Sequence, residues 1–353
     1  MDNDQTETQA PVVPAADAAP KPKKKSIALK SVAIFLAVTI SLGLIIGLVF
    51  SQEIVDLLYG LSYEPSAEMS QAISNVGFSS KAEFIMRSTR PSFEEADAFN
   101  EYCPSANEDV STLGCYSSFE IRIYIYDIQD DELNGVKESI LNHEVLHAIY
   151  ERLNEGKRNE LDAELDKYYK EHQDFFGDYM DSYTEDMYYT ELHSIIGQRV
   201  HYADLSLPLQ NHYSQYYADY DKAVGFYDSY HAKLDKIDKE VSALSDEIDA
   251  MREDIDQRTA AYNADLEQLN RDIDYHNTQA NMGYWSQSRY DSLTARSNQL
   301  DAVRDNLNND IEQFNTKVES FNNLLDSRSH LYGLLDSKYE KKTESLIPDE
   351  VAN

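Results

Sequence analysis

Two runs of apolar residues, spaced alternately by three and four positions, occupy the carboxyl-terminal third of the chain. The first run extends from Leu234 to Ile273 and the second from Leu293 to Leu335. Spacing sustained over this length is typical of helices that bury one stripe against a neighbouring helix in a coiled coil. Each run covers about 45 residues, which as a helix would measure ~65 Å. Whatever else the chain contains, it must therefore accommodate two long helices that pack along their length.

The segment 277–288 separates the two runs. It contains Asn and Ser residues and the only tryptophan, Trp285. Because arms of similar length flank one break, we expect an antiparallel helical hairpin over residues 233–342, with two parallel helices in a dimer as the alternative. At the turn, Met282, Tyr284 and Trp285 are expected either to contact a protein partner or to fold back onto the arms.

A third apolar run lies near the amino terminus. Residues 31–50 contain no charged side chain, and their length is sufficient for a helix to cross a hydrocarbon core. The preceding segment 21–25 contains four lysines, whereas after the apolar run no Lys or Arg follows until Lys81. This asymmetry predicts a cytoplasmic amino terminus and extracytoplasmic carboxyl-terminal domains. We expect an uncleaved single-pass anchor over residues 26–51 that contacts the lipid bilayer through residues 31–50; a cleaved signal peptide is the alternative.

The chain is strongly acidic. It has 64 Asp and Glu residues against 31 Lys and Arg, which gives a formal net charge of −33. Nucleic-acid phosphates would be repelled, so nucleic acid is excluded as a partner. Residues 1–25 and 343–353 are expected to be disordered tails, the first of them cytoplasmic. Residues 52–232, between the anchor and the hairpin, are enough for one further domain.

The two cysteines lie close together in sequence. Cys103 and Cys115 flank a loop-like segment on the expected outer side of the membrane. An even count outside the cytoplasm predicts a disulfide that closes this small loop and contributes about 2–3 kcal/mol. Two separate buried thiols are the alternative.

The domain between anchor and hairpin is expected to be mainly helical, with few strands. Residues 119–128 alternate in polarity and predict a β-strand in which Ile121, Ile123 and Ile125 face one way. A second, short strand is expected over residues 82–88. Helices are expected over residues 93–102, 159–176 and 184–200, and a tyrosine-rich packed segment over 201–232. The fold class predicted for the whole chain is α+β, mainly α.

Residues 143–147 read His-Glu-Val-Leu-His within a segment whose apolar residues follow a helical pattern. Positions four apart share one helix face, so His143 and His147 can direct both imidazoles at one metal ion. Glu144, beside the first imidazole, can take a proton from a metal-bound water. The alternative is an ordinary amphipathic helix that has this pattern by chance, so the interpretation depends on a third ligand.

A catalytic zinc ion usually has three protein ligands and one open position. No third histidine follows at the expected short spacing, so we look for a distant carboxylate. Glu191 is the best candidate because Met187 and Ile195 lie four positions to either side and place it in an apolar stripe, where a carboxylate is costly unless paired or metal-bound. A glutamate at the edge of a solvated face is the alternative. The other candidate ligands are Glu160, Asp162, Glu164 and His172.

An HExxH motif followed by a glutamate on a later helix resembles the gluzincin group of zinc metallopeptidases. More closely, the chain is similar to a group of bacterial membrane-anchored metallopeptidases whose substrate is not settled. The segments that carry this similarity are 99–103, 113–116, the strand at 122–126, 142–153 and 190–197. The similarity extends over roughly residues 60–232. Asn142 departs from the small residue expected before the first histidine, a difference that should affect packing more than chemistry.

The resemblance implies a zincin-like metallopeptidase domain over residues 52–232. Zn²⁺ would be held by His143, His147 and Glu191, and Glu144 would serve as the general base in the hydrolysis of a protein or peptide substrate. In such peptidases an edge strand beside the HExxH helix commonly holds an extended peptide, a role that the strand at 119–128 would fill.

The donor that stabilises the oxyanion is not identified by the sequence. His193 and Tyr202 are the candidates, although for His193 a structural hydrogen bond is the favoured interpretation. The alternative function for the whole chain is a non-catalytic envelope protein that presents the coiled-coil hairpin to a partner.

Overall fold

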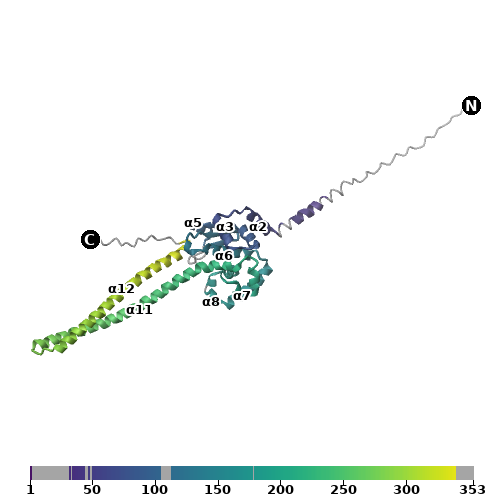
Figure 1. Cartoon of the computed structure of the whole chain (residues 1–353). Helices are drawn as coiled ribbons and strands as arrows, with labels where there is room; N and C mark the ends of the chain where they lie inside the picture. The colour runs from purple at the N-terminus through teal and green to yellow at the C-terminus, as the bar shows by residue number, and fades with distance from the viewer. Residues whose placement is uncertain are drawn as a thin grey trace. The chain divides into compact units, whose positions relative to one another are not determined.

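The computed structural model of the chain describes residues 1, 32, 34–43, 47, 50–104, 113–177 and 179–338. The chain divides into two compact units, Met1–Val55 and Asp56–Asn353. It is mainly helical with one small sheet (Figure 1), which confirms the predicted α+β, mainly α class. The tails expected over 1–25 and 343–353 lie, except for Met1, outside the described residues.

The apolar run over residues 31–50 is described only in part. Residues 34–43 within it are helical. Among the residues that the structure describes, no helix is both long enough and apolar enough to span a membrane.

Three short helices, α2 (Ser51–Ser62), α3 (Ala67–Val76) and α4 (Ser80–Thr89), follow this run. The strand expected over residues 82–88 is wrong, because this segment is part of α4. The hydroxyl of Ser79 accepts a hydrogen bond from the Ala82 amide and caps the helix. Ala82, Ile85 and Met86 are buried, so the apolar residues follow the helical spacing of three and four rather than an alternation of two.

The sheet has three strands, β1 (Ser92–Glu94), β2 (Gly114–Ser117) and β3 (Arg122–Tyr126), in the order β1-β3-β2. β1 is parallel to β3, and β2 is antiparallel to it. The strand predicted over residues 119–128 is therefore the central strand, and it cannot receive an extended peptide as an edge strand. β1 and β2 are the edge strands, and of these β2 packs against α6.

The helix expected over residues 93–102 begins later than predicted. Its first residues form β1, and the helix α5 spans Ala96–Tyr102. Phe93 pairs with Ile125 of β3. This pairing between distant segments overrides the local helical signal after Ser92.

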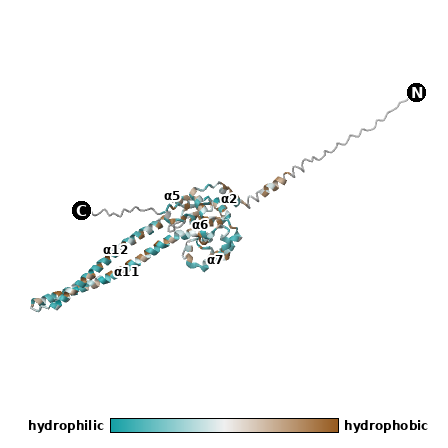
Figure 2. Ribbon diagram, in the orientation of Figure 1, coloured by the Kyte–Doolittle hydropathy of each residue, from teal (hydrophilic) through white to brown (hydrophobic). Residues whose placement is uncertain are grey.

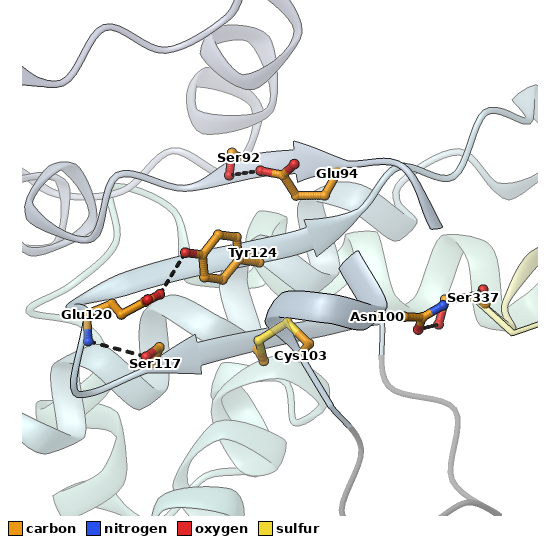
Figure 3. The surroundings of a disulfide bond; sticks show 9 residues. Ser92, Glu94, Asn100, Cys103, Ser117, Glu120, Tyr124 and Ser337 are labelled. Atoms are coloured by element: carbon orange, nitrogen blue, oxygen red, sulfur yellow. Dashed lines mark hydrogen bonds between the residues drawn. A yellow bond between two sulfur atoms is a disulfide. The ribbon is translucent and has the colours of Figure 1, made fainter. Parts of the chain in front are cut away.

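A disulfide joins Cys103, just after α5, to Cys115 on β2. Figure 3 shows Cys103 beside the ring of Tyr124, on the side of the sheet where α5 lies. Asn100 of α5 also exchanges hydrogen bonds with Ser337, at 2.8 and 2.9 Å, which attaches the chain just beyond the last helix to the same corner (Figure 3). The pairing of the cysteines is the one expected from the sequence.

The remaining helices of the base, which we define as residues 56–219, surround α6 (Val136–Glu151) in the middle of the domain (Figure 1). They are α7 (Glu155–Glu171), α8 (Gln173–Phe176), α9 (Tyr188–Arg199) and α10 (Leu207–Tyr213), with 3₁₀ helices η1 (Asp131–Leu133), η2 (Tyr179–Ser182) and η3 (Tyr202–Asp204). α6 packs against α3, α4, α9, β2 and β3. Helix thus occupies most of both segments where it was expected: α7 and α8 cover 159–176 except for His172, and within 184–200 the helix α9 begins only at Tyr188.

The tyrosine-rich segment packs into this core. The side chains of Tyr213, Tyr217 and Tyr220 are buried. The hydroxyl of Tyr217 donates a hydrogen bond of 2.6 Å to the side-chain oxygen of Asn142, which is fully buried on α6. A small residue was expected at position 142, and the asparagine found there affects packing: its buried side-chain oxygen accepts a hydrogen bond from a tyrosine 75 positions away.

Two long helices, α11 (Tyr220–Asn281) and α12 (Gln287–Leu334), lie side by side and antiparallel (Figure 1). Their surfaces are mostly hydrophilic (Figure 2). Four ion pairs, distributed along the arms, agree with a single antiparallel register: Arg328 with Asp238, Lys317 with Glu247, Arg258 with Asp310 and Arg296 with Asp272. α11 runs through residue 232 without a break, and its first residues, including Ala223 and Val224, belong to the core of the base.

A buried ion pair connects α2 to the carboxyl end of α6. Both nitrogens of one edge of the Arg152 guanidinium donate to the Asp56 carboxylate at 2.8 Å. The two side chains are 9% and 3% exposed. Arg152 also donates to the hydroxyl of Ser88 on α4 and to the carbonyl of Ala148. The pair thus orients three helices around one charge.

We predict that Asp56→Ala lowers the free energy of unfolding of the base by about 3–5 kcal/mol, because the substitution leaves the Arg152 charge buried and unpaired. Urea unfolding followed by near-UV circular dichroism of the tyrosines measures this loss. Asp249→Ala is the matched control, since Asp249 pairs with Arg252 on an exposed helix surface. Equal unfolding midpoints for the two variants would contradict the prediction.

Candidate metal centre

The HExxH motif lies in the buried middle of α6. The Nε2 atoms of His143 and His147 are 3.1 Å apart, as expected for positions one helical turn apart on the same face. Their side chains are 15% and 11% exposed. Both imidazoles therefore point to one small region with limited access to water.

Glu191 reaches this region from α9. Its two carboxylate oxygens lie 3.6 Å from His143 Nε2 and 3.5 Å from His147 Nε2. One donor atom from each of the three side chains lies within 4.8 Å of the others, and within the described part of the chain no other group of His, Cys, Asp or Glu side chains meets this criterion. The structure thus brings together the three ligands expected from the sequence.

A glycine allows α9 to lie close to α6. A Cβ atom at Gly197 would lie 2.6 Å from the Tyr213 ring and 2.8 Å from Leu146 Cδ1. A larger residue here would require the Tyr213 ring and the Leu146 side chain to shift, or α9 to move.

The donor set fits a divalent metal such as zinc. Ligand atoms about 2.0–2.1 Å from a tetrahedral zinc ion are about 3.3 Å from one another, close to the separations within this triad. The Glu191 oxygen that faces His143 is buried and lacks a hydrogen-bond partner among the described residues, so the direct contacts leave an acceptor that a cation would satisfy.

The protonation preferences of two of the three side chains also suit metal binding. Burial lowers the pKa of His147 to about 4, so its imidazole is neutral at neutral pH. Burial opposes ionisation of Glu191, but the adjacent imidazoles lower the pKa of its carboxyl below the ordinary value. The carboxylate of Glu191 therefore remains available as an anionic ligand. Burial lowers the pKa of the third, His143, but the hydrogen bond to Glu191 and the charge of Glu144 outweigh it and raise the pKa above the ordinary value, so a metal would displace a proton there.

The imidazole of His147 is oriented by a further contact. Its Nδ1 atom lies 2.9 Å from the hydroxyl of Thr190, the residue before Glu191. A partner on the second ring nitrogen would hold Nε2 toward a metal bound by the triad, with the Nδ1–H donating to the hydroxyl.

Glu144 lies beside the triad, between α6 and the edge strand β2. Its side chain is buried, and its carboxylate accepts a hydrogen bond from the backbone N–H of Tyr116. Burial raises the pKa of Glu144 to about 7, with the Glu191 carboxylate acting in the same direction. A carboxyl group with this pKa can both take and release a proton near neutral pH.

β2 must approach α6 closely for this contact. A Cβ atom at Gly114 would lie 2.8 Å from a carboxylate oxygen of Glu144 and 2.5 Å from Ile140 Cγ2. The amide of Tyr126 donates to the carbonyl of Leu113, so in the antiparallel ladder Gly114 and Tyr116 direct their backbone groups away from β3. These backbone groups lie along the edge of the sheet that faces the candidate site.

Neither candidate oxyanion donor lies in a suitable place. His193 is fully buried, its Nε2 lies 2.9 Å from His212 Nε2, and its ring stacks on Tyr213. This environment supports a structural role. Tyr202 follows the carboxyl end of α9, and its ring packs against Tyr220.

The other candidate ligands lie outside the triad. Asp162 accepts a hydrogen bond from the hydroxyl of Tyr150, and the ring of His172 stacks on Tyr168. Glu160 is exposed and Glu164 half-buried on α7.

Two residues near the triad were missed by the sequence reasoning. The hydroxyl of Tyr183 faces Glu191 and helps to lower the pKa of its carboxyl. The guanidinium of Arg199 lies between the rings of Tyr179 and Tyr227, at 5.0 and 4.9 Å, and its charge opposes protonation of His143. No periodicity marks either residue, because Tyr183, just after η2, and Arg199, at the end of α9, take their places near the triad only in the folded chain.

Comparison of the chain with protein-family models, with characterised proteins and with solved structures gave no match. The candidate site is therefore defined by its own geometry.

We predict that the purified chain binds one zinc ion, and that His143→Ala and Glu191→Ala each abolish binding because two ligands cannot hold the ion tightly. Elemental analysis after dialysis, with chelator competition for affinity, provides the measurement. Thr190→Val should weaken binding by about 10–100-fold through loss of the support to His147.

His172→Ala is the matched control for this prediction, since its ring lies outside the triad. Retention of full zinc content by His143→Ala and Glu191→Ala, at the level of the control, would contradict the assignment of the ligands.

Proposed function

We propose that the chain is a membrane-anchored zinc metallopeptidase that hydrolyses peptide bonds outside the cytoplasm. The observation that carries the proposal is the convergence of His143, His147 and Glu191 within 4.8 Å, beside the buried carboxyl of Glu144 with its pKa near 7. Three ligands with a neighbouring acid–base group are the arrangement that hydrolytic zinc sites use.

When bound, zinc would supply Lewis-acid chemistry, lowering the pKa of a water molecule and polarising the carbonyl group of the substrate. The chain's own contribution begins with the triad, which holds the ion. Glu144 then takes the proton of the attacking water on its carboxylate and delivers it to the leaving amine. Its raised pKa makes both transfers feasible near neutral pH.

The edge strand β2 supports a peptide as the substrate. Gly114 and Tyr116 direct their backbone groups away from β3 toward the side where Glu144 lies. An extended peptide that adds to this edge would pair with backbone rather than with particular side chains, and it would compete with Glu144 for the Tyr116 amide. Its scissile bond would then lie beside Glu144 and the triad.

A donor for the developing oxyanion is available in Tyr183. Its hydroxyl lies 2.9 Å from that of Tyr179 and faces Glu191. A tyrosine hydroxyl at the border of the triad can donate to a negatively charged oxygen as it forms. Tyr183 replaces His193 and Tyr202 as the candidate for this role.

The sequence supports the membrane location. Residues 31–50 carry no charge, and five lysines precede them. The Cys103–Cys115 disulfide agrees with an oxidising compartment for the base.

We predict that Glu144→Gln retains zinc but lowers hydrolysis by about 10²–10⁴-fold, because the amide keeps the shape of the side chain and cannot take up the proton. Cleavage of a broad peptide mixture by the zinc-loaded full chain, followed by mass spectrometry, is the measurement. Glu160→Gln, on the exposed surface of α7, is the control and should retain activity. Full activity in Glu144→Gln would exclude the proposed mechanism.

The hairpin favours a second function, the binding of a protein partner. At its turn Met282, Tyr284 and Trp285 are 65%, 71% and 58% exposed. The Trp285 ring lies against His276 of α11 and Tyr290 of α12, at centroid distances of 5.0 and 5.6 Å. Tyr and Trp with few charges around them are typical of the centres of protein interfaces. A non-catalytic role of the whole chain would rest on this surface alone.

We predict that removal of residues 250–315, with a short Gly-containing turn joining the shortened arms, leaves zinc binding and peptide cleavage unchanged. The retained part keeps Leu234, Ile237 and Leu331, the buried arm residues that belong to the core of the base. Metal analysis and the same cleavage assay provide the readouts. Loss of both activities in a folded variant would mean that the distal hairpin is part of the catalytic machinery.

A further inference from the structure

α2 has an inverted polarity for a helix at the surface of a water-soluble domain. Asp56 faces the protein and is 2% exposed, whereas Leu57, Leu58 and Leu61 face outward and are 48%, 61% and 76% exposed. A helix on such a surface normally buries its apolar stripe and exposes its charges. The leucines of α2 fall within an arc of about 100° on the side opposite Asp56.

The rotation of α2 is fixed by specific contacts, so the leucines cannot turn inward. The Asp56 carboxylate is bound by Arg152 through two hydrogen bonds. Gly60 packs against α4, where a Cβ atom would lie 3.6 Å from Arg87 Cβ. At the end of the helix the hydroxyl of Tyr63 donates to the carbonyl of Pro91 at 2.6 Å. Turning the helix to bury the leucines would break all three contacts.

The segment of α2 that carries the leucines is uncharged, unlike most of this acidic chain. Residues 57–63 contain no charged side chain, and Asp56 is neutralised by its ion pair. The exposed acids nearest in sequence are Glu53 in the first turn of α2 and Glu64 beyond its end. Two arginines border α2, with Arg90 over the ring of Tyr59 at 4.0 Å and Arg87 over the ring of Tyr63 at 5.7 Å. Leucines bordered by tyrosine and arginine are typical of helices that lie at a membrane surface.

A neighbouring turn extends the apolar surface. Arg90 donates hydrogen bonds to the carbonyls of Glu120 and Ile121 in the turn between β2 and β3. This turn carries Phe119, which is 97% exposed. A fully exposed phenylalanine next to the arginine that borders α2 is a second observation that points to an apolar surrounding.

Lipid is the occupant that fits best. The uncharged run 31–50 leads directly into α2. If this run enters a bilayer, α2 begins at the surface of that bilayer. The leucines offer no hydrogen-bonding group, and hydrocarbon requires none. A protein interface would instead be expected to have aromatic anchors at its centre.

We propose that the outer face of α2, formed by Leu57, Leu58 and Leu61, lies against the lipid bilayer. The Asp56–Arg152 pair joins α2 to the end of α6, so this contact sets the orientation of the candidate metal centre relative to the membrane. The proposal goes beyond the peptidase function and shares with it only the membrane location.

The experiment uses the full chain reconstituted with phosphatidylcholine vesicles. Three variants, Leu58→Cys, Leu61→Cys and Leu207→Cys, each carry one added cysteine, which is labelled with an environment-sensitive fluorophore. The two native cysteines do not react with the label because they are joined in a disulfide. Leu207, on α10, is the matched control because it is also a leucine and is 68% exposed. We expect blue-shifted emission at positions 58 and 61 and loss of this emission with brominated lipid, and neither effect at position 207.

Three results would overturn the proposal. The first is emission at positions 58 and 61 that matches position 207. The second is blue-shifted emission that brominated lipid does not quench, which would show that protein, from another molecule or a second copy, covers the face. The third is failure of the labelled chains to float with vesicles.

These readouts do not depend on zinc or on hydrolysis, so failure of the peptidase proposal leaves them unaffected. Flotation reports on the run 31–50, and quenching reports on α2 itself. Near-UV circular dichroism of each labelled variant verifies that it is folded.

Discussion

The close contact between α6 and α9 is the constraint on which the candidate site depends. Both imidazoles come from one helical turn of α6, but the carboxylate of Glu191 comes from α9 and has to be delivered to them. The absence of a side chain at Gly197 permits this approach. The same packing places Thr190 against His147, so one helix contact supplies both the third donor and the group that orients the second imidazole.

A second set of contacts connects the surface of the base to the site. Arg152 at the end of α6 binds Asp56 of α2 and Ser88 of α4, and it also donates to the hydroxyl of Tyr116 on β2. The backbone of Tyr116 in turn binds Glu144. One buried cation therefore links the helix with the exposed leucines, the edge strand and the acid–base group, because an unpaired guanidinium in the core would be costly. The disulfide attaches the same edge strand to α5.

Local patterns predicted the elements whose signals lie within a few residues. The heptad runs correspond to α11 and α12, and the alternation of Ile123 and Ile125 corresponds to β3. The pattern failed where pairing between distant segments decides. Residues 92–94 became a strand because β3 offers them a partner, and residues 82–88 became a helix because their buried face faces the core at helical spacing. β3 lies at the centre of the sheet, with β2 at one edge, because β1 pairs with the other side of β3.

For the site, the sequence by itself determined the parts that the geometry of one helix dictates. His143, Glu144 and His147 had to share neighbouring faces of α6, and Glu191 stood out because a carboxylate in an apolar stripe needs a partner. Only the tertiary structure decided that Tyr183 and Arg199 join them, that the side-chain oxygen of Asn142 accepts a hydrogen bond from Tyr217, and that Gly114 lets β2 touch Glu144. These relations join residues far apart in the chain, and side-chain packing between elements, rather than the periodicity within any one of them, sets such distances.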